Sequence, residues 1–119
     1  MPLAFVPPPA SADEAEGANW KRGRIYYRSV CSSCHKAKAE RKISPMDKTI
    51  AEWNAYFDAD KHGDQALKFY VSREYRDSVK DSNRVVAKFI DLPDEQLWAD
   101  LRAWVTHGAK DSDTPARCN

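Results

Sequence analysis

Cys31-Ser32-Ser33-Cys34-His35 is the stretch that decides how this chain folds. On a helix, residues three positions apart lie on nearly the same side, so Cys31 and Cys34 present their thiols together. His35 follows at once and brings an imidazole to the same place. Thiols form covalent and metal bonds, and imidazole is a common metal ligand. We therefore expect a helix that ends in a binding site.

The spacing Cys-x-x-Cys-His is typical of the attachment site for a c-type haem. Cys31 and Cys34 would hold the porphyrin through thioether bonds, one to each vinyl group, and His35 would ligate the iron. The motif therefore predicts one covalent haem c with its iron. Cys31, Cys34 and His35 are the expected binding residues.

Two other chemistries use cysteine pairs. A thiol–disulfide site usually lies near a βαβ pattern, and this sequence has no strand pattern. A structural zinc ion needs four ligands, but the rest of the chain offers only Cys118, His62 and His107, with no second clustered pair. Cys118 is left over by the haem motif, and we expect a terminal thiol without a function.

The composition excludes several classes of protein. The 119 residues fit one domain, and a net charge of +1 with 31% charged residues gives no bias toward nucleic acid. No apolar run approaches the length of a membrane span. The first residues, from Met1 to Val6, lack the basic and apolar regions of a secretory signal. Because haem is attached to such motifs outside the cytoplasm, we expect a periplasmic protein whose leader is absent from the numbered chain. A cytoplasmic chain without haem is the alternative.

The sequence divides into an extended, Pro-rich tail at 1–18 and a helical domain at 19–119. Asn19 can cap a helix that runs into the motif, and Gly23 inside this helix indicates close approach of another helix. Thr49 and Glu52 form a capping box for a second helix, with Gly63 as its expected C-cap. Together these signals predict an all-α fold, a small helical domain around one haem.

The second half of the chain continues this pattern. A short helix is expected within 66–75, and Asp81-Ser82-Asn83 offers caps for another. The clearest helix begins near Pro93, carries acidic residues in its first turn, shows amphipathic spacing from Leu97 to Val105, and stops at Gly108.

These features resemble monohaem class I cytochromes c. The shared features are a glycine and an aromatic residue before Cys-x-x-Cys-His and a last helix that opens Leu92-Pro93-Asp94-Glu95-Gln96-Leu97. The resemblance implies that the first and last helices cross near Gly23, with Trp98 and Trp104 packed at the crossing. Most class I members carry a methionine before the final helix, and residues 83–91 contain none. The middle of the chain, from Ile43 to Met46 and on to Lys61-His62, is similar to periplasmic cytochromes of metal- or electrode-respiring bacteria.

Three residues are candidates for the second axial ligand of the iron. Met46, the internal methionine, is the first candidate, and His62 is the alternative. His107 ends the last helix and ranks third, because in class I geometry that end is far from the distal face. In the same family, a proline carbonyl orients the proximal imidazole, and Pro45 would have this role toward His35. If Pro45 binds His35 on the proximal side, Met46 cannot easily reach the other side. An open distal position is the remaining possibility.

Basic residues gather around the motif. The segment from Lys21 to Lys42 holds one acid, Glu40, and the following basic residues: Lys21, Arg22, Arg24, Arg28, Lys36, Lys38, Arg41 and Lys42. This set, named the basic rim here, is either an ordinary solvated surface or a surface that steers an acidic redox protein.

The sequence as a whole predicts a soluble electron carrier rather than an enzyme, with redox proteins as partners. No cluster of acid–base or nucleophilic residues is recognisable. One alternative is a haem protein with an open distal site that binds a gas or peroxide, as a sensor or small oxidase. Another is the haem domain of a larger redox enzyme.

Overall fold

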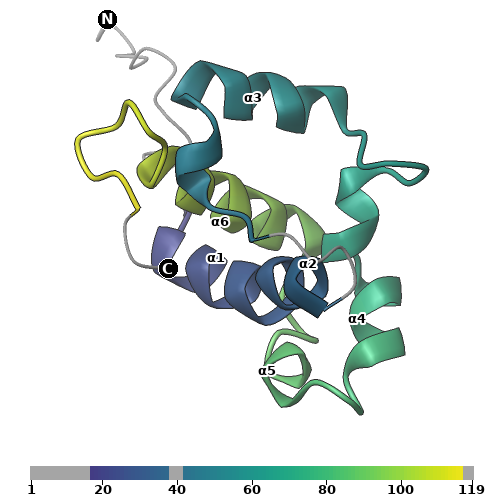
Figure 1. Cartoon of the computed structure of the whole chain (residues 1–119). Helices are drawn as coiled ribbons and strands as arrows, with labels where there is room; N and C mark the ends of the chain where they lie inside the picture. Colours follow the sequence, from purple (N-terminus) through teal and green to yellow (C-terminus); the bar gives the residue numbers. More distant parts are fainter. Residues whose placement is uncertain (1–16, 38–41, 117–119) are drawn as a thin grey trace, which may run out of the picture.

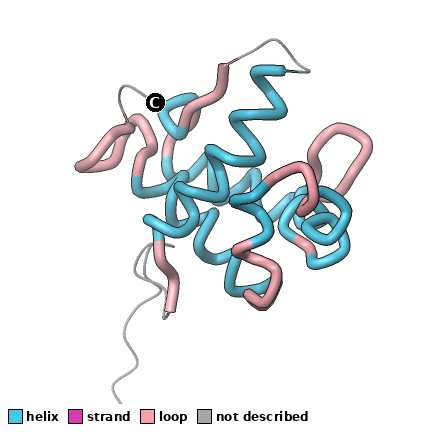
Figure 2. The backbone as a smooth tube through the Cα atoms, turned by 90° about the horizontal axis from the view of Figure 1, so that it is seen from below, coloured by secondary structure: helices cyan, strands magenta, loops and turns pink. Residues whose placement is uncertain are grey.

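The computed structural model describes residues 17–37 and 42–116, which form a helical unit (Figures 1 and 2). This part of the chain contains no strand, and one isolated bridge joins His62 to Gln65. The elements in chain order are α1 (Trp20–Tyr26), the π-helix η2 (Tyr27–Ser32), α2 (Ser33–Ala37), the 3-10 helix η3 (Pro45–Asp47), α3 (Ile50–Ala59), the 3-10 helix η4 (Leu67–Val71), α4 (Arg73–Val79), α5 (Arg84–Ala87) and α6 (Asp94–His107). The expected all-α class is confirmed for these residues.

The first helix begins where the sequence predicts. The Asn19 side chain accepts hydrogen bonds from the backbone N–H groups of Lys21 and Arg22, which α1 cannot satisfy internally. Helix α1 then continues without a break through η2 into α2, so one helical segment leads into the cysteine motif. The π-helical geometry of η2 was not predicted. It is a geometry often found at functional sites.

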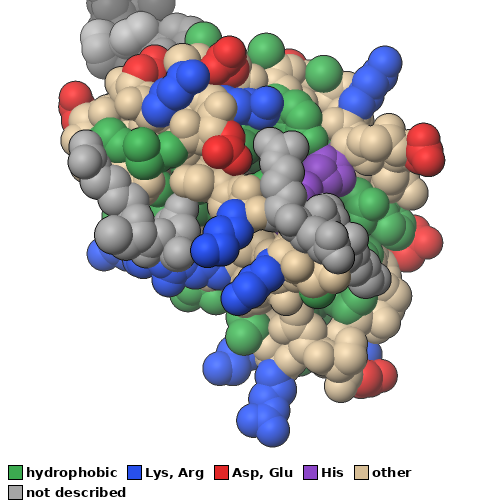
Figure 3. Space-filling model, in the orientation of Figure 1, with side chains coloured by type: hydrophobic (Ala, Val, Ile, Leu, Met, Phe, Trp, Pro, Cys, Tyr) green, Lys and Arg blue, Asp and Glu red, His purple; other side chains and the backbone are tan. Residues whose placement is uncertain are grey.

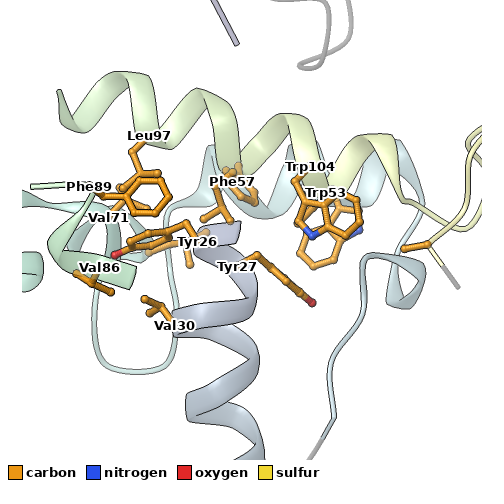
Figure 4. Packing of buried hydrophobic residues seen from close by; sticks show 14 of the residues in the cluster. Tyr26, Tyr27, Val30, Trp53, Phe57, Val71, Val86, Phe89, Leu97 and Trp104 are labelled. Atoms are coloured by element: carbon orange, nitrogen blue, oxygen red, sulfur yellow. The ribbon is translucent and has the colours of Figure 1, made fainter. Parts of the chain in front are cut away.

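Helices α1 and α6 cross in close contact at Gly23, as predicted. A Cβ atom at Gly23 would lie 1.9 Å from the backbone oxygen of Asp100 and 2.9 Å from the backbone nitrogen of Leu101. Only glycine leaves room for the α6 backbone there. Figure 4 shows this arrangement, with the side chains of Tyr26 and Tyr27 below those of Leu97 and Trp104 on α6.

A buried carboxylate fixes this crossing. Asp100 is fully buried and accepts hydrogen bonds from the backbone nitrogen of Asn19 at 2.8 Å and from Nε2 of Gln96 at 3.0 Å. It also forms an ion pair with Arg22 of α1. Because its oxygens are satisfied from both helices, the charge is stabilised inside the protein and joins the start of α1 to α6.

Helix α3 lies above α6 in Figure 1 and packs against it. The predicted capping box is confirmed, since the hydroxyl of Thr49 accepts from the N–H of Glu52 and the Glu52 carboxylate accepts from the N–H of Thr49. The predicted C-cap at Gly63 is wrong. Helix α3 ends at Ala59, and its C-cap is Asp60, which adopts the left-handed conformation (φ 51°). The carboxylate of Asp60 accepts a hydrogen bond from the N–H of Lys68, which the sequence did not reveal.

The segment from 66 to 92 holds shorter elements than expected. The helix expected within 66–75 divides at Ser72, whose hydroxyl caps α4 after η4 has ended. Asn83 caps α5 as expected, but α5 lasts one turn. In place of a longer helix, the side chain of the buried Arg76 joins the separate parts of this region. Its guanidinium donates to the carbonyls of Phe89 and Leu92 and pairs with Asp94.

Helix α6 provides one side of the core. It spans Asp94–His107, with Pro93 at its N-cap and Gly108 at its C-cap as expected, and its buried face includes Leu97, Leu101 and Trp104. Trp98 is only partly buried, and its ring lies 4.7 Å from that of Phe57 on α3. Residues 1–16, for which an extended tail is predicted, residues 38–41 and Cys118 lie outside the described residues. No helix among the described residues is long and apolar enough to cross a membrane.

Candidate functional site

A cavity of about 450 Å³ lies between the helices, within the size range of ligand pockets. Its wall is mostly apolar and aromatic and includes side chains of α3, η4, α4 and α6. Those residues are Trp53, Tyr56, Phe57, Leu67, Tyr70, Tyr75, Leu101 and Val105. The cavity therefore suits a large apolar group with few polar contacts.

All three residues of the motif line this cavity. Cys31 lies near the end of η2, and Cys34 and His35 follow on α2. One ring nitrogen of His35, Nδ1, is buried and has no hydrogen-bond partner among the described residues. An imidazole with an unsatisfied buried nitrogen costs free energy. The expected bond from this nitrogen to the carbonyl of Pro45 is not formed.

His62 lines the same cavity as His35, and the two imidazole rings lie close together. The two ring centroids are 5.7 Å apart and the rings are tilted by 57°. A metal ion bound on both sides by imidazole nitrogens at about 2 Å would hold the centroids about 6 Å apart. The spacing of the two rings therefore matches that of two axial ligands on one ion.

The backbone after α3 holds His62 in place. Asp60 and Gly63 both have positive φ values, 51° and 65°, so the chain turns sharply on either side of His62. The N–H of His62 donates to the carbonyl of Gln65 at 2.7 Å, and the N–H of Gln65 donates back at 3.2 Å. His62 is thus carried on a closed turn rather than on a long loop.

Two tyrosines contact the ring of His62. The hydroxyl of Tyr56 is hydrogen-bonded to Nδ1 at 2.5 Å, and the ring of Tyr70 meets the histidine edge-on at 5.4 Å. Burial lowers the pKa of His62, and the nearby His35 lowers it further. Both effects favour the neutral imidazole, which is the form that binds metals.

Met46, the first candidate for the distal ligand, is not among the residues that line the cavity. It is partly buried and packs against the core beside Pro45. The Pro45 carbonyl accepts a hydrogen bond from Nε1 of Trp53 at 2.7 Å instead of one from His35. His107 is also away from the cavity, because its ring stacks on Trp20 at 3.9 Å. The geometry favours His62 over both.

The two other uses of a cysteine pair receive no support. Cys31 and Cys34 are both free, and burial raises the pKa of the Cys31 thiol to about 12. A redox-active dithiol needs the opposite shift, because the thiolate is the reactive form. Within residues 17–37 and 42–116, no three His, Cys, Asp or Glu side chains are grouped to hold a metal ion by themselves.

A second polar group in the cavity also lacks a partner. Tyr27 is buried, with 4% of its surface exposed, and its hydroxyl has no hydrogen-bond partner in the described part of the chain. Figure 4 shows this hydroxyl pointing away from the labelled side chains of the core. Lys48 lies at the same cavity, with Nζ 5.7 Å from the centre of the Trp53 ring. An acceptor on a bound group would satisfy Tyr27.

The basic rim is only partly available to a partner. Arg22 pairs with Asp100, and Arg24 lies over the ring of Trp104 at 5.6 Å. Lys38 and Arg41 lie outside the described residues. The members that are exposed are Lys21, Arg28, Lys36 and Lys42. In Figure 3, lysine and arginine side chains gather over the lower part of the face, and a histidine is visible between hydrophobic side chains above them.

Comparison with known family models, curated proteins and solved structures finds no match. The cavity geometry therefore carries the functional interpretation. Sequence reasoning found four of its polar or reactive residues, Cys31, Cys34, His35 and His62, and missed Tyr56 as a contact of His62. The signal for Tyr56 was present, since it lies on the aromatic face of the second helix, six positions before the histidine.

Proposed function

We propose that this chain is a monohaem c-type cytochrome that carries single electrons between redox proteins. Cys31 and Cys34 would form the two thioether bonds, His35 would be the proximal ligand, and His62 the distal ligand. The observation that supports this most strongly is the pair of imidazoles, with ring centroids 5.7 Å apart, in the wall of a cavity that both cysteines also line.

The protein's own residues have clear roles in such a carrier. A bound haem supplies a one-electron couple between ferric and ferrous iron. The aromatic wall, with Trp53 and Phe57 buried, keeps water from the apolar faces of the group. The turn at 60–65 would hold His62 as a ligand of the iron in both oxidation states. Axial ligands set the reduction potential of a haem within a range about 0.8 V wide. Two histidine ligands would therefore give a different potential from one histidine and one methionine.

Covalent attachment is the direct test. In a host competent for cytochrome c maturation, the wild type is expected to hold one haem per chain that acidified acetone does not extract. The double variant Cys31→Ala/Cys34→Ala should lose all covalent pigment, because no thiol remains to form a thioether. Ser33→Ala is the matched control, since Ser33 is exposed within the same motif. A colourless wild type, or pigment that washes out of it, would contradict the proposal.

The basic rim supports an acidic redox partner. Three of its exposed members, Lys21, Arg28 and Lys36, lie on α1, η2 and α2, the segment that carries the cysteines, and the fourth, Lys42, precedes Ile43 of the cavity wall. Charges of one sign near a redox site raise the encounter rate with partners of the opposite sign, and salt screens the effect.

We expect Lys36→Glu/Lys42→Glu to slow oxidation of the ferrous protein by anionic ferricyanide about tenfold at low salt. The same variant should speed oxidation by a cationic cobalt complex, and both effects should shrink at high salt. Lys68→Glu is the control, because Lys68 is exposed on η4 and lies over Trp98 rather than in the rim. Equal slowing by the control would remove the rim from the proposal.

A further inference from the structure

The hydroxyl of Tyr56 makes the one side-chain hydrogen bond that the described structure gives to the ring of His62. Tyr56 lies on α3 and His62 on the turn that follows, so the bond joins a helix to the residue proposed as the distal ligand. The ring of Tyr56 is itself packed at 6.0 Å against the buried Trp53. The hydroxyl is therefore carried by a ring that packs against the core.

The chemistry of ligation decides the direction of this bond. An imidazole that binds a metal through Nε2 must leave that nitrogen bare, so its proton is on Nδ1. In that state Nδ1–H of His62 donates and the oxygen of Tyr56 accepts. Ligating histidines almost always donate their second N–H in this way, which fixes the ring orientation and makes the ligand more basic.

We propose that Tyr56 is a positioning residue that orients His62 and lowers the reduction potential of the protein. This inference rests on the proposed function. Donation from Nδ1 to Tyr56 increases the electron density on the imidazole, and an electron-rich ligand favours the more positive, ferric state. One electron from a redox partner converts ferric to ferrous iron, and neither Tyr56 nor His62 gains or loses a proton in that step.

The test compares two tyrosine-to-phenylalanine variants of the holoprotein. Tyr56→Phe removes the acceptor and keeps the ring, so packing is preserved. Tyr70→Phe is the matched control, because its ring touches the edge of His62 at 5.4 Å, while Tyr70 accepts the hydroxyl of Tyr26 through its backbone carbonyl, which the variant keeps. We expect Tyr56→Phe to shift the ferric–ferrous equilibrium about tenfold toward the ferrous state, which for one electron is about 59 mV. Tyr70→Phe should shift it less than about twofold.

A second readout reports the orientation of the ring. The electron paramagnetic resonance spectrum of the ferric protein depends on the relative angle of the two imidazole planes. Tyr56→Phe should broaden or shift this low-spin spectrum, and Tyr70→Phe should leave it unchanged.

The failure of this inference is distinct from failure of the proposed function. If His62→Ala loses the low-spin spectrum but Tyr56→Phe has the potential of the wild type, Tyr56 has no positioning role. Equal shifts in Tyr56→Phe and Tyr70→Phe would also overturn the inference, because they would reflect general opening of the cavity. If His62→Ala itself resembles the wild type, the ligand assignment fails first.

Discussion

His62→Ala is expected to convert a low-spin, six-coordinate haem protein into one with an open position on the iron. The ferrous variant should bind carbon monoxide with a high apparent affinity. In the wild type, under the proposed ligation, carbon monoxide would have to compete with His62, which the turn at 60–65 holds. If the open state makes up about 1% of the wild type, its apparent affinity is about 100-fold weaker than that of the variant. Visible spectra and carbon monoxide titrations measure both effects.

Met46→Ala is the control for this experiment. Met46 packs beside Pro45 and does not line the cavity, so its removal should leave the low-spin spectrum and the carbon monoxide affinity unchanged. The ferric wild type should also lack the charge-transfer band of a methionine ligand. If the Met46→Ala variant were high-spin and the His62→Ala variant low-spin, the distal ligand would be Met46 and not His62. An open iron in the wild type would favour the gas- or peroxide-binding alternative.

Gly23→Ala is expected to lower the free energy of unfolding by about 3 kcal/mol. The added Cβ would lie 1.9 Å from the backbone oxygen of Asp100, and no side-chain rotation can move that atom. Helices α1 and α6 would have to separate, which disturbs the buried bonds of Asp100. Alanine favours a helix interior by only about 1 kcal/mol relative to glycine, so the clash dominates.

Chemical denaturation followed by far-ultraviolet circular dichroism measures this loss. Ile25→Ala is the matched control, since it ends in the same residue on the same helix, but Ile25 is 51% exposed and away from the crossing. It should change the stability by less than about 1 kcal/mol. Two variants of equal stability would mean that the helices do not cross at Gly23.

Local signals in the sequence predicted local structure well. Asn19, the Thr49/Glu52 capping box and Pro93 each satisfy or replace backbone donors within one turn, so their effect does not depend on the rest of the fold. The helix crossing was also predictable, because a glycine inside an amphipathic helix destabilises that helix and is usually retained where another backbone packs closely against it.

The errors concern choices that tertiary contacts decide. Gly63 was expected to be the C-cap of α3, because glycine adopts a left-handed conformation most easily. The C-cap is instead Asp60, whose carboxylate accepts a hydrogen bond from the N–H of Lys68. Met46 and His62 are both within reach of the cavity along the chain. Only the folded structure distinguishes these two candidates. In it, the indole N–H of Trp53 on α3 donates to the carbonyl of Pro45 on η3, and Met46 lies outside the cavity wall.

The two proposed axial ligands are anchored by unequal amounts of structure. His35 lies on α2, in a continuous helical segment whose α1 part packs against α6, whereas His62 lies on a turn closed by two backbone hydrogen bonds and has one side-chain hydrogen bond, to Tyr56. Segments with few supporting contacts open at lower free energy than the global unfolding of a protein. With the haem attached as proposed, mild denaturing conditions would therefore release the imidazole of His62 first, while His35 would stay near the iron through the thioethers of its neighbours Cys31 and Cys34.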